Sequence, residues 1–320
     1  MNDKYLLEKY GPMCSSDNAY TARARFMQSW YRAIILMQND FGFGPEESSK
    51  TKYGNVLVNG EKTGLNFLSP KIFHYAQFRT QFLKNGETIK EYRLFNNMLS
   101  SQPMCFNLFY PLKELFEKDH KKACKLFKDC FPALQIDQVL AVEIEYLPYP
   151  VSEYLNDRTA FDAMLIYKTA SGERNILAIE TKYVEKLGNN PSSNLSKQIE
   201  LVNNCKMFND HGKKEVSNGF GQLGRNFLLA EKFRMENRLD KVFAVVISPE
   251  ENTSSKNEIK EFYSTMNEEF HSRLFYVSLE DMIKRIKSNP FQSIKSWVDL
   301  FEKRYLRFEE SDKLLLDIKR

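Results

Sequence analysis

Apolar residues recur at helical spacing through the first part of this 320-residue chain, which predicts that residues 1–134 are mainly helical. The clearest stretch runs from Ala19 to Met37. Its apolar positions, four or three residues apart, are Phe26, Trp30, Ile34 and Met37. The arginines among them are expected on the solvent side of a core-facing helix, at Arg23, Arg25 and Arg32. A platform on which nucleic-acid bases stack is the alternative for this mixture of arginines and aromatic rings.

Three more helices and one hairpin are expected before the pattern changes, and one of these helices runs roughly from Thr88 to Leu99. Ser69 followed by Pro70 predicts a helix start, because serine caps the first turn and proline suits its geometry. A further helix is expected from Leu112 to Cys130. Gly-Asn and Asn-Gly pairs within residues 52–64 predict a hairpin.

From Gln135 onwards the pattern becomes that of strands. Residues 138–147 alternate and are rich in β-branched side chains, which predicts a strand. Residues 159–167 and 174–183 predict two further strands that form an antiparallel hairpin, with Gly172 in the turn. A helix at 221–236, a buried strand at 242–249 and a strand leading into a helix at 273–286 follow, and the chain ends in helices.

This order of elements predicts an α/β protein with a central mixed β-sheet flanked by helices. We expect three parts: a mainly helical region at 1–134 packed on the core, the core itself at 135–288, and a C-terminal helical segment at 289–320.

The central hairpin carries an unusual set of charges. Asp162 and Glu180 lie at equal distances from residue 171, so a symmetric register makes them cross-strand neighbours with Cβ atoms about 5 Å apart. Lys182 shares a strand face with Glu180, because side chains two residues apart in a strand point the same way. Two carboxylates so close repel each other, and a hard divalent cation such as Mg²⁺ removes that conflict. A solvated cluster of ion pairs is the alternative reading of the same residues.

Composition adds only a little information on the partner and the cellular compartment of the protein. The formal charge of +4 and the pI of about 8.6 permit a polyanionic partner without requiring one. The five cysteines show no metal-ligand spacing and predict free thiols in a reducing compartment. The N-terminus has no signal-peptide pattern and no apolar run approaches membrane-spanning length, so we expect a cytoplasmic protein with no membrane contact.

The charged hairpin and several other segments make the chain recognisable. The first acid at Asp162 followed by Glu180-Thr181-Lys182 resembles the signature of the PD-(D/E)xK nuclease superfamily, with Phe161 where that signature has proline. Within the superfamily, the chain resembles a family of predicted restriction endonucleases from roughly residue 25 to residue 249. The segments that carry this likeness are 92–112, 145–150 with 157–162, 179–185 and 221–230.

The resemblance implies a restriction-endonuclease-like core and Mg²⁺-dependent cleavage of nucleic acid, with double-stranded DNA as the expected substrate and Mn²⁺ as a substitute ion. It also implies roles for residues of this chain. Asp162 and Glu180 would bind the metal and Lys182 would serve the attacking water, while Glu145 in the preceding strand would complete the metal site. Gln222 would approach the scissile phosphate from the following helix, although an exposed polar helix face explains Gln222 equally well.

Three functions remain open at this point. The first is a restriction or other anti-phage defence endonuclease, and the second is a repair or recombination nuclease. The third is a catalytically silent nucleic-acid-binding module of the same fold. A homodimer and a partner protein from a defence system are further expectations that the resemblance leaves open.

Overall fold

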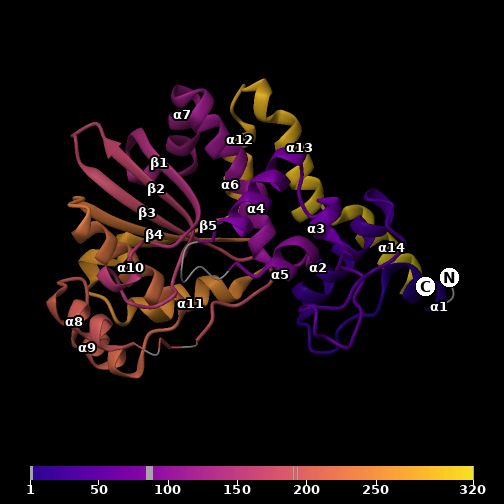
Figure 1. Cartoon of the computed structure of the whole chain (residues 1–320), viewed down its shortest axis with the longest axis horizontal. Coiled ribbons are helices and arrows are strands. Elements are labelled where there is room, and N and C mark those ends of the chain that lie inside the picture. The colour runs from indigo at the N-terminus through magenta and orange to yellow at the C-terminus, as the bar shows by residue number, and fades with distance from the viewer. Residues whose placement is uncertain (1–2, 84–88, 190, 193, 320) are drawn as a thin grey trace.

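A mixed β-sheet forms the centre of the protein. The computed structural model describes residues 3–83, 89–189, 191–192 and 194–319. The described residues form a five-stranded sheet in the order β1-β2-β3-β4-β5 (Figure 1). The strands are β1 (Ile136–Tyr146), β2 (Phe161–Thr169), β3 (Arg174–Thr181), β4 (Lys241–Ser248) and β5 (Leu274–Ser278). The first three strands pair antiparallel, whereas β3-β4 and β4-β5 are parallel pairs.

Helices precede, cover and follow this sheet (Figure 1). Before it lie α1 (Asp3–Tyr10), α2 (Ala19–Trp30), α3 (Gly60–Thr63), α4 (Pro70–Gln81), α5 (Glu91–Asn96), α6 (Ser101–Lys118) and α7 (His120–Cys130). Between β3 and β4 lie α8 (Ser196–Asn204), α9 (Asp210–Glu215) and α10 (Gln222–Glu236). The remaining helices are α11 (Thr253–Tyr263), α12 (Leu279–Lys287), α13 (Gln292–Tyr305) and α14 (Glu309–Lys319). This arrangement confirms the predicted mixed sheet flanked by helices.

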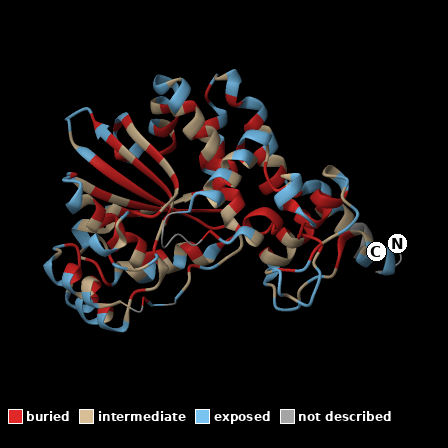
Figure 2. Ribbon diagram, in the orientation of Figure 1, coloured by how far each residue is buried: buried red, intermediate tan, exposed pale blue. Residues whose placement is uncertain are grey.

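The sheet is buried on both faces, because its strands present alternate side chains to two separate cores. Leu165 and Leu177 pack into one core together with residues of α6, α7, α12 and α13. Their neighbours Met164 and Ile176 point the other way, into a second core built with α10. Buried positions accordingly follow one another along the central strands (Figure 2). This double burial explains why β3 and β4 are continuous apolar runs in the sequence.

The first predicted helix differs from the structure in its second half. The α-helix ends at Trp30 and continues as a π-helical turn over Tyr31–Ile35. The helix ends there, so Met37, whose backbone has a positive φ of 53°, lies beyond it. Phe26 and Trp30 are buried as expected, but Met37 is 79% exposed. The burial of the rings also favours the core interpretation over a base-stacking platform.

Arg32 was expected on the solvent side, and that prediction is wrong. Its side chain is fully buried. Its guanidinium donates hydrogen bonds to the backbone carbonyls of Gly54, Asn39 and Lys9, at 2.7, 2.9 and 2.5 Å, and also to that of Gln38. The arginine is buried because these carbonyls, which lie in the last turn of α1 and in the irregular segments that hold residues 38–39 and 54, need donors that regular hydrogen bonding does not supply.

Two other local predictions also need correction. The helix expected from Leu112 to Cys130 is two helices, because Asp119 ends α6 and caps α7 by accepting a hydrogen bond from the Lys122 amide. The hairpin expected at residues 52–64 does not form. That segment makes only isolated bridges, such as Val56 with Asn97, and it includes the short helix α3.

The helical regions at both ends share a core with the sheet. Phe106 of α6 and Phe301 of α13 belong to the same apolar cluster as Leu165 of β2. The proposed division of the chain at residues 134 and 288 therefore remains a prediction. Residues 1–2 and 84–88 of the first part and residue 320 of the last part lie outside the described residues.

All five cysteines are free thiols, as expected. No helix in the described part of the chain is long and apolar enough to cross a membrane.

Candidate active site

The two acidic residues of the hairpin lie side by side at one edge of the sheet. The β2-β3 register pairs Ala163 with Ile179, so the next step along places Asp162 opposite Glu180, as the symmetric register predicts. Asp162 is held by the residue that follows Glu180. The backbone amide and the hydroxyl of Thr181 both donate to Asp162 Oδ2, at 2.7 and 2.9 Å. The short β-hairpin thus fixes the first carboxylate relative to the second strand.

A hydrogen-bonded network surrounds the carboxylate of Glu180. Lys182 Nζ lies 2.7 Å from Glu180 Oε1 and donates to Gln222 Oε1 at 3.0 Å. Gln222 Nε2 donates to the same Glu180 oxygen at 2.7 Å. Asn226, one turn further along α10, donates to Glu180 Oε2. The start of α10 therefore supplies two amide side chains to the end of β3, which places the predicted Gln222 at the site.

Glu145 reaches the same region from β1. The pairs Ile144 with Ala163 and Tyr146 with Phe161 flank it, so Glu145 stands in line with Asp162. Its backbone has a positive φ of 50°, which interrupts the regular strand. Two side chains hold it in this position. Gln102 Nε2 of α6 donates to Glu145 Oε1 at 3.2 Å, and Arg79 Nη2 of α4 donates to the Glu145 carbonyl at 2.9 Å.

Burial sets the electrostatics of these carboxylates. Removal from water, followed by repulsion from the Asp162 charge, raises the pKa of Glu180 to about 7. The same two causes raise the pKa of Glu145 to about 8. Burial also raises the pKa of Asp162, although the Lys182 charge and the Thr181 hydrogen bonds oppose that rise. The raised pKa values mean that the protein alone stabilises the ionised forms of these three carboxyls poorly.

Lys182 remains protonated in this environment. Burial acts to lower the pKa of Lys182, but the charges of Glu180 and Asp162 outweigh that effect and raise its pKa above the usual range. Glu180 and Lys182 are only 4% and 6% exposed, whereas Asp162 and Glu145 are half-buried. A ligand approaching from solvent therefore meets Asp162 and Glu145 before it meets the lysine.

The residues present fit a hard divalent cation in their chemistry. Carboxylate oxygens are the donors that Mg²⁺ prefers, and a cation would relieve the repulsion that raises the pKa values. However, no three His, Cys, Asp or Glu side chains in the described part of the chain are arranged so that they could hold a metal ion. Both oxygens of Glu180 accept hydrogen bonds from Gln222 and Asn226 instead. The ligand set of Glu145, Asp162 and Glu180 stays a prediction.

Sequence reasoning missed some contributors to this site or left them without a role. Thr181 was named only as the middle residue of a motif, yet it holds Asp162. Gln102 lies in the segment 92–112 that carries the resemblance, but its contact with Glu145 depends on how α6 packs. Arg225 lies one turn after Gln222 and makes only a long hydrogen bond, 3.5 Å, to Thr159 among the contacts described.

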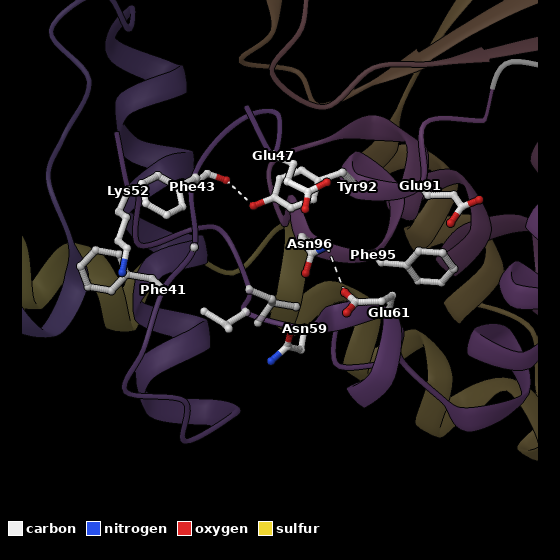
Figure 3. Close-up of a pocket in the computed structure, with 13 residues that line it drawn as sticks. Phe41, Phe43, Glu47, Lys52, Asn59, Glu61, Glu91, Tyr92, Phe95 and Asn96 are labelled. Atoms are coloured by element: carbon white, nitrogen blue, oxygen red, sulfur yellow. Dashed lines mark hydrogen bonds between the residues drawn. The ribbon is translucent and has the colours of Figure 1, made fainter. Parts of the chain in front are cut away.

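A separate pocket lies in the N-terminal region and does not contain the predicted site (Figure 3). Phe41, Phe43 and Lys52 line one side, and Tyr92 and Phe95 of α5 line the other. The Tyr92 hydroxyl donates to the Phe43 carbonyl at 2.7 Å, which connects the two sides. Asp162, Glu180, Lys182, Glu145 and Gln222 are absent from its described lining.

Comparison with known proteins agrees with the geometry of the hairpin. The family model of the PD-(D/E)XK nuclease superfamily matches residues 15–307, nearly the whole chain. The chain therefore belongs to the PD-(D/E)XK nuclease superfamily, and its mixed sheet with flanking helices is consistent with the restriction-endonuclease-like fold predicted from the sequence. Membership implies a nucleic-acid substrate, and nucleases of this superfamily generally use divalent metal ions. Searches of curated proteins and of solved structures found no match.

Proposed function

We propose that this protein is a metal-dependent endonuclease that hydrolyses phosphodiester bonds of double-stranded DNA in restriction or another anti-phage defence. The observation that carries the proposal is the meeting of Asp162, Glu180 and Lys182 at one edge of the sheet, in a chain of a nuclease superfamily. The choice of DNA and of defence rests on the resemblance to predicted restriction endonucleases.

In this proposal Asp162 and Glu180 hold Mg²⁺, with Glu145 as the third carboxylate. When bound, the ion would lower the pKa of a water molecule and offset charge on the phosphate oxygens. Mn²⁺ has similar ligand preferences and is the expected substitute. Asp162 and Glu145 are more exposed than Glu180 and Lys182, so in this proposal the substrate phosphate approaches from their side.

Lys182 acts in the proposal as a hydrogen-bond donor and a fixed positive charge. Its pKa is raised, so at neutral pH it donates protons in hydrogen bonds and does not accept one from water. The ammonium orients the attacking water or stabilises the charge that develops on the phosphate. Gln222 supports this role by accepting one Lys182 hydrogen bond and donating to Glu180, which fixes both groups at once.

A substrate panel tests the proposal. Supercoiled plasmid, linear duplex, single-stranded DNA and RNA are each incubated with the protein and with Mg²⁺, Mn²⁺ or EDTA. We expect cleavage of closed circular and linear duplex with either metal and none with EDTA. Cleavage of RNA alone, or cleavage that survives EDTA, would contradict the proposed substrate or the proposed chemistry.

The same panel separates the two other functions. A repair or recombination nuclease that needs ends would spare closed circular DNA and degrade the linear duplex. A silent binding module would retain DNA in a gel-shift assay and cut none of the four substrates. Sedimentation of the protein with and without duplex tests the expected homodimer. Co-purification of other proteins with the tagged protein from its native cells tests for a partner protein.

A further inference from the structure

Glu185 lies three residues after Lys182 and joins three segments through its carboxylate. Glu185 Oε1 accepts hydrogen bonds from the Ser101 amide at 2.8 Å and from Arg93 Nη2 at 3.3 Å. Glu185 Oε2 accepts from the Tyr183 amide at 3.2 Å. The side chain thus connects the segment that follows β3 with α5 and with the first residue of α6.

The start of α6 is in turn connected to the predicted catalytic acids. Ser100 caps the helix by accepting a hydrogen bond from the Gln102 amide at 3.3 Å. The side chain of Gln102 donates to Glu145, and Cys105 Sγ, one turn later, contacts the Asp162 carbonyl at 3.2 Å. The first turns of α6 therefore contact both Glu145 and Asp162.

The segment around Glu185 is fixed from its other side as well. The buried Asn252 donates through Nδ2 to the carbonyls of Tyr183 and Glu185, at 3.1 and 3.0 Å. Arg93 is also 3.4 Å from the Ser100 hydroxyl, to which it donates. Its neighbours Tyr92 and Phe95 on α5 line the separate pocket, so Arg93 points from that helix toward the active-site segment.

We propose that Glu185 is a positioning residue for the nuclease reaction. Its carboxylate holds the start of α6 against the strand that carries Glu180 and Lys182, so that Gln102 and Glu145 keep their places beside Asp162. The proposal rests on the proposed function and extends it to a residue outside the predicted catalytic set.

A carboxylate is required at this position because both of its oxygens accept hydrogen bonds from N–H donors. Glutamine has one accepting oxygen, so its NH₂ group would face either the Tyr183 amide or the Ser101 amide and Arg93. Glu185→Gln therefore breaks one connection while it preserves size and shape. A displacement of about 1 Å at a reacting group can cost about 100-fold in rate.

The test compares Glu185→Gln with Glu231→Gln, both in the full chain. Glu231 is a matched control, because it is a buried glutamate that binds Arg234 through both oxygens at 2.7 and 2.8 Å on α10. Single-turnover cleavage of duplex DNA gives the rate, and binding of the same duplex in Ca²⁺ gives the affinity. We expect Glu185→Gln to lower the rate by about 10- to 100-fold, with affinity within about threefold of wild type.

Hydrogen exchange provides a readout that does not depend on activity. The backbone amides of residues 100–102 and 104–106 should exchange faster in Glu185→Gln than in wild type, and should be unchanged in Glu231→Gln. An unchanged rate of cleavage, or unchanged exchange of these amides, would overturn the proposal. If wild type cleaves nothing, the proposed function fails, and the exchange of residues 100–106 alone then decides whether Glu185 positions α6.

Discussion

Lys182 Nζ and Gln222 Oε1 lie 3.0 Å apart although 40 residues of sequence separate them. Gln222 also donates to Glu180 at 2.7 Å, so one amide side chain binds both members of the ion pair. The amide is suited to this place because it offers an acceptor to the ammonium and a donor to the carboxylate. The first residue of α10 thereby sets the orientation of the two groups that the proposed chemistry uses most.

Replacing Gln222 with methionine tests that arrangement. Gln222→Met keeps the length of the side chain but removes its hydrogen bonds to Lys182, to Glu180 and to the Gly188 amide, so Lys182 and Glu180 lose a shared partner. We expect the single-turnover cleavage rate to fall by about 10- to 100-fold with little change in DNA affinity. Gln198→Met is the matched control, because Gln198 is also buried and donates to a carboxylate, that of Asp157, at 3.4 Å. Equal rates in the two variants would contradict the role of Gln222.

Glu145→Gln should change how stability depends on pH in the metal-free protein. Folding raises the pKa of Glu145 from 4.5 to about 8, by burial and by the Asp162 charge, so the folded state favours the protonated acid. Wild type therefore loses stability as pH rises from about 4.5 to 8, whereas glutamine stays neutral.

Thermal unfolding in EDTA measures this difference. The Tm of Glu145→Gln minus that of wild type should be near zero at pH 5 and positive at pH 8.5, where each 1 kcal/mol gained corresponds to about 2–4 °C. Glu143→Gln, on the same strand, controls for the loss of a carboxylate. A difference that does not change with pH would show that the Glu145 pKa is not raised.

The free cysteines should react with iodoacetamide in a fixed order. A hydrogen bond with the Ser16 side chain lowers the pKa of Cys14, which is half-exposed. Burial raises the pKa of Cys130 to about 12 and raises that of Cys105 well above its usual value. Peptide mass spectrometry should find Cys14 labelled first, and Cys105 and Cys130 labelled only on unfolding. Early labelling of Cys105 would mean that the contact between α6 and Asp162 opens readily.

Arg32→Met should destabilise the protein strongly. The guanidinium donates to several backbone carbonyls, among them that of the buried Gly54, which methionine leaves without this donor. We expect the free energy of unfolding to fall by about 2–4 kcal/mol in urea titrations. Arg23→Met, at a half-exposed arginine paired with Asp312, should cost only about 0–1 kcal/mol. A loss for Arg32→Met as small as that for Arg23→Met would contradict the structural role of Arg32.

The hairpin chemistry could be predicted because it is local in sequence. Asp162, Glu180 and Lys182 belong to two adjacent strands, and the period of two along a strand decides which of their side chains share a face. The positions of the sheet strands followed from the same alternation and from apolar runs. Gln222 was placed near the site only by the resemblance to the nuclease superfamily, because its position at the start of a helix 40 residues after Lys182 is equally consistent with an exposed polar face.

Contacts between distant segments could not be predicted in this way. Gln102 meets Glu145 across 43 residues and the Ser101 amide meets Glu185 across 84, and only the packing of α6 against the sheet creates both contacts. The burial of Arg32 could not be predicted because arginine is seldom fully buried, and the neighbouring sequence does not indicate that backbone carbonyls need a donor there. The π-helical turn after Trp30 similarly depends on tertiary packing that helical spacing does not reveal.

The most direct test of the account is cleavage of supercoiled plasmid in Mg²⁺ by Asp162→Asn and Lys182→Met. Their matched controls are Asp17→Asn and Lys113→Met, since Asp17 and Lys113 are largely buried in ion pairs with Arg25 and Glu143 elsewhere in the fold. We expect metal-dependent cleavage by wild type and both controls. In both site variants the cleavage rate should fall by about 1,000-fold or more while the proteins remain folded. Cleavage by either site variant at the rate of its control would contradict the assignment of the active site.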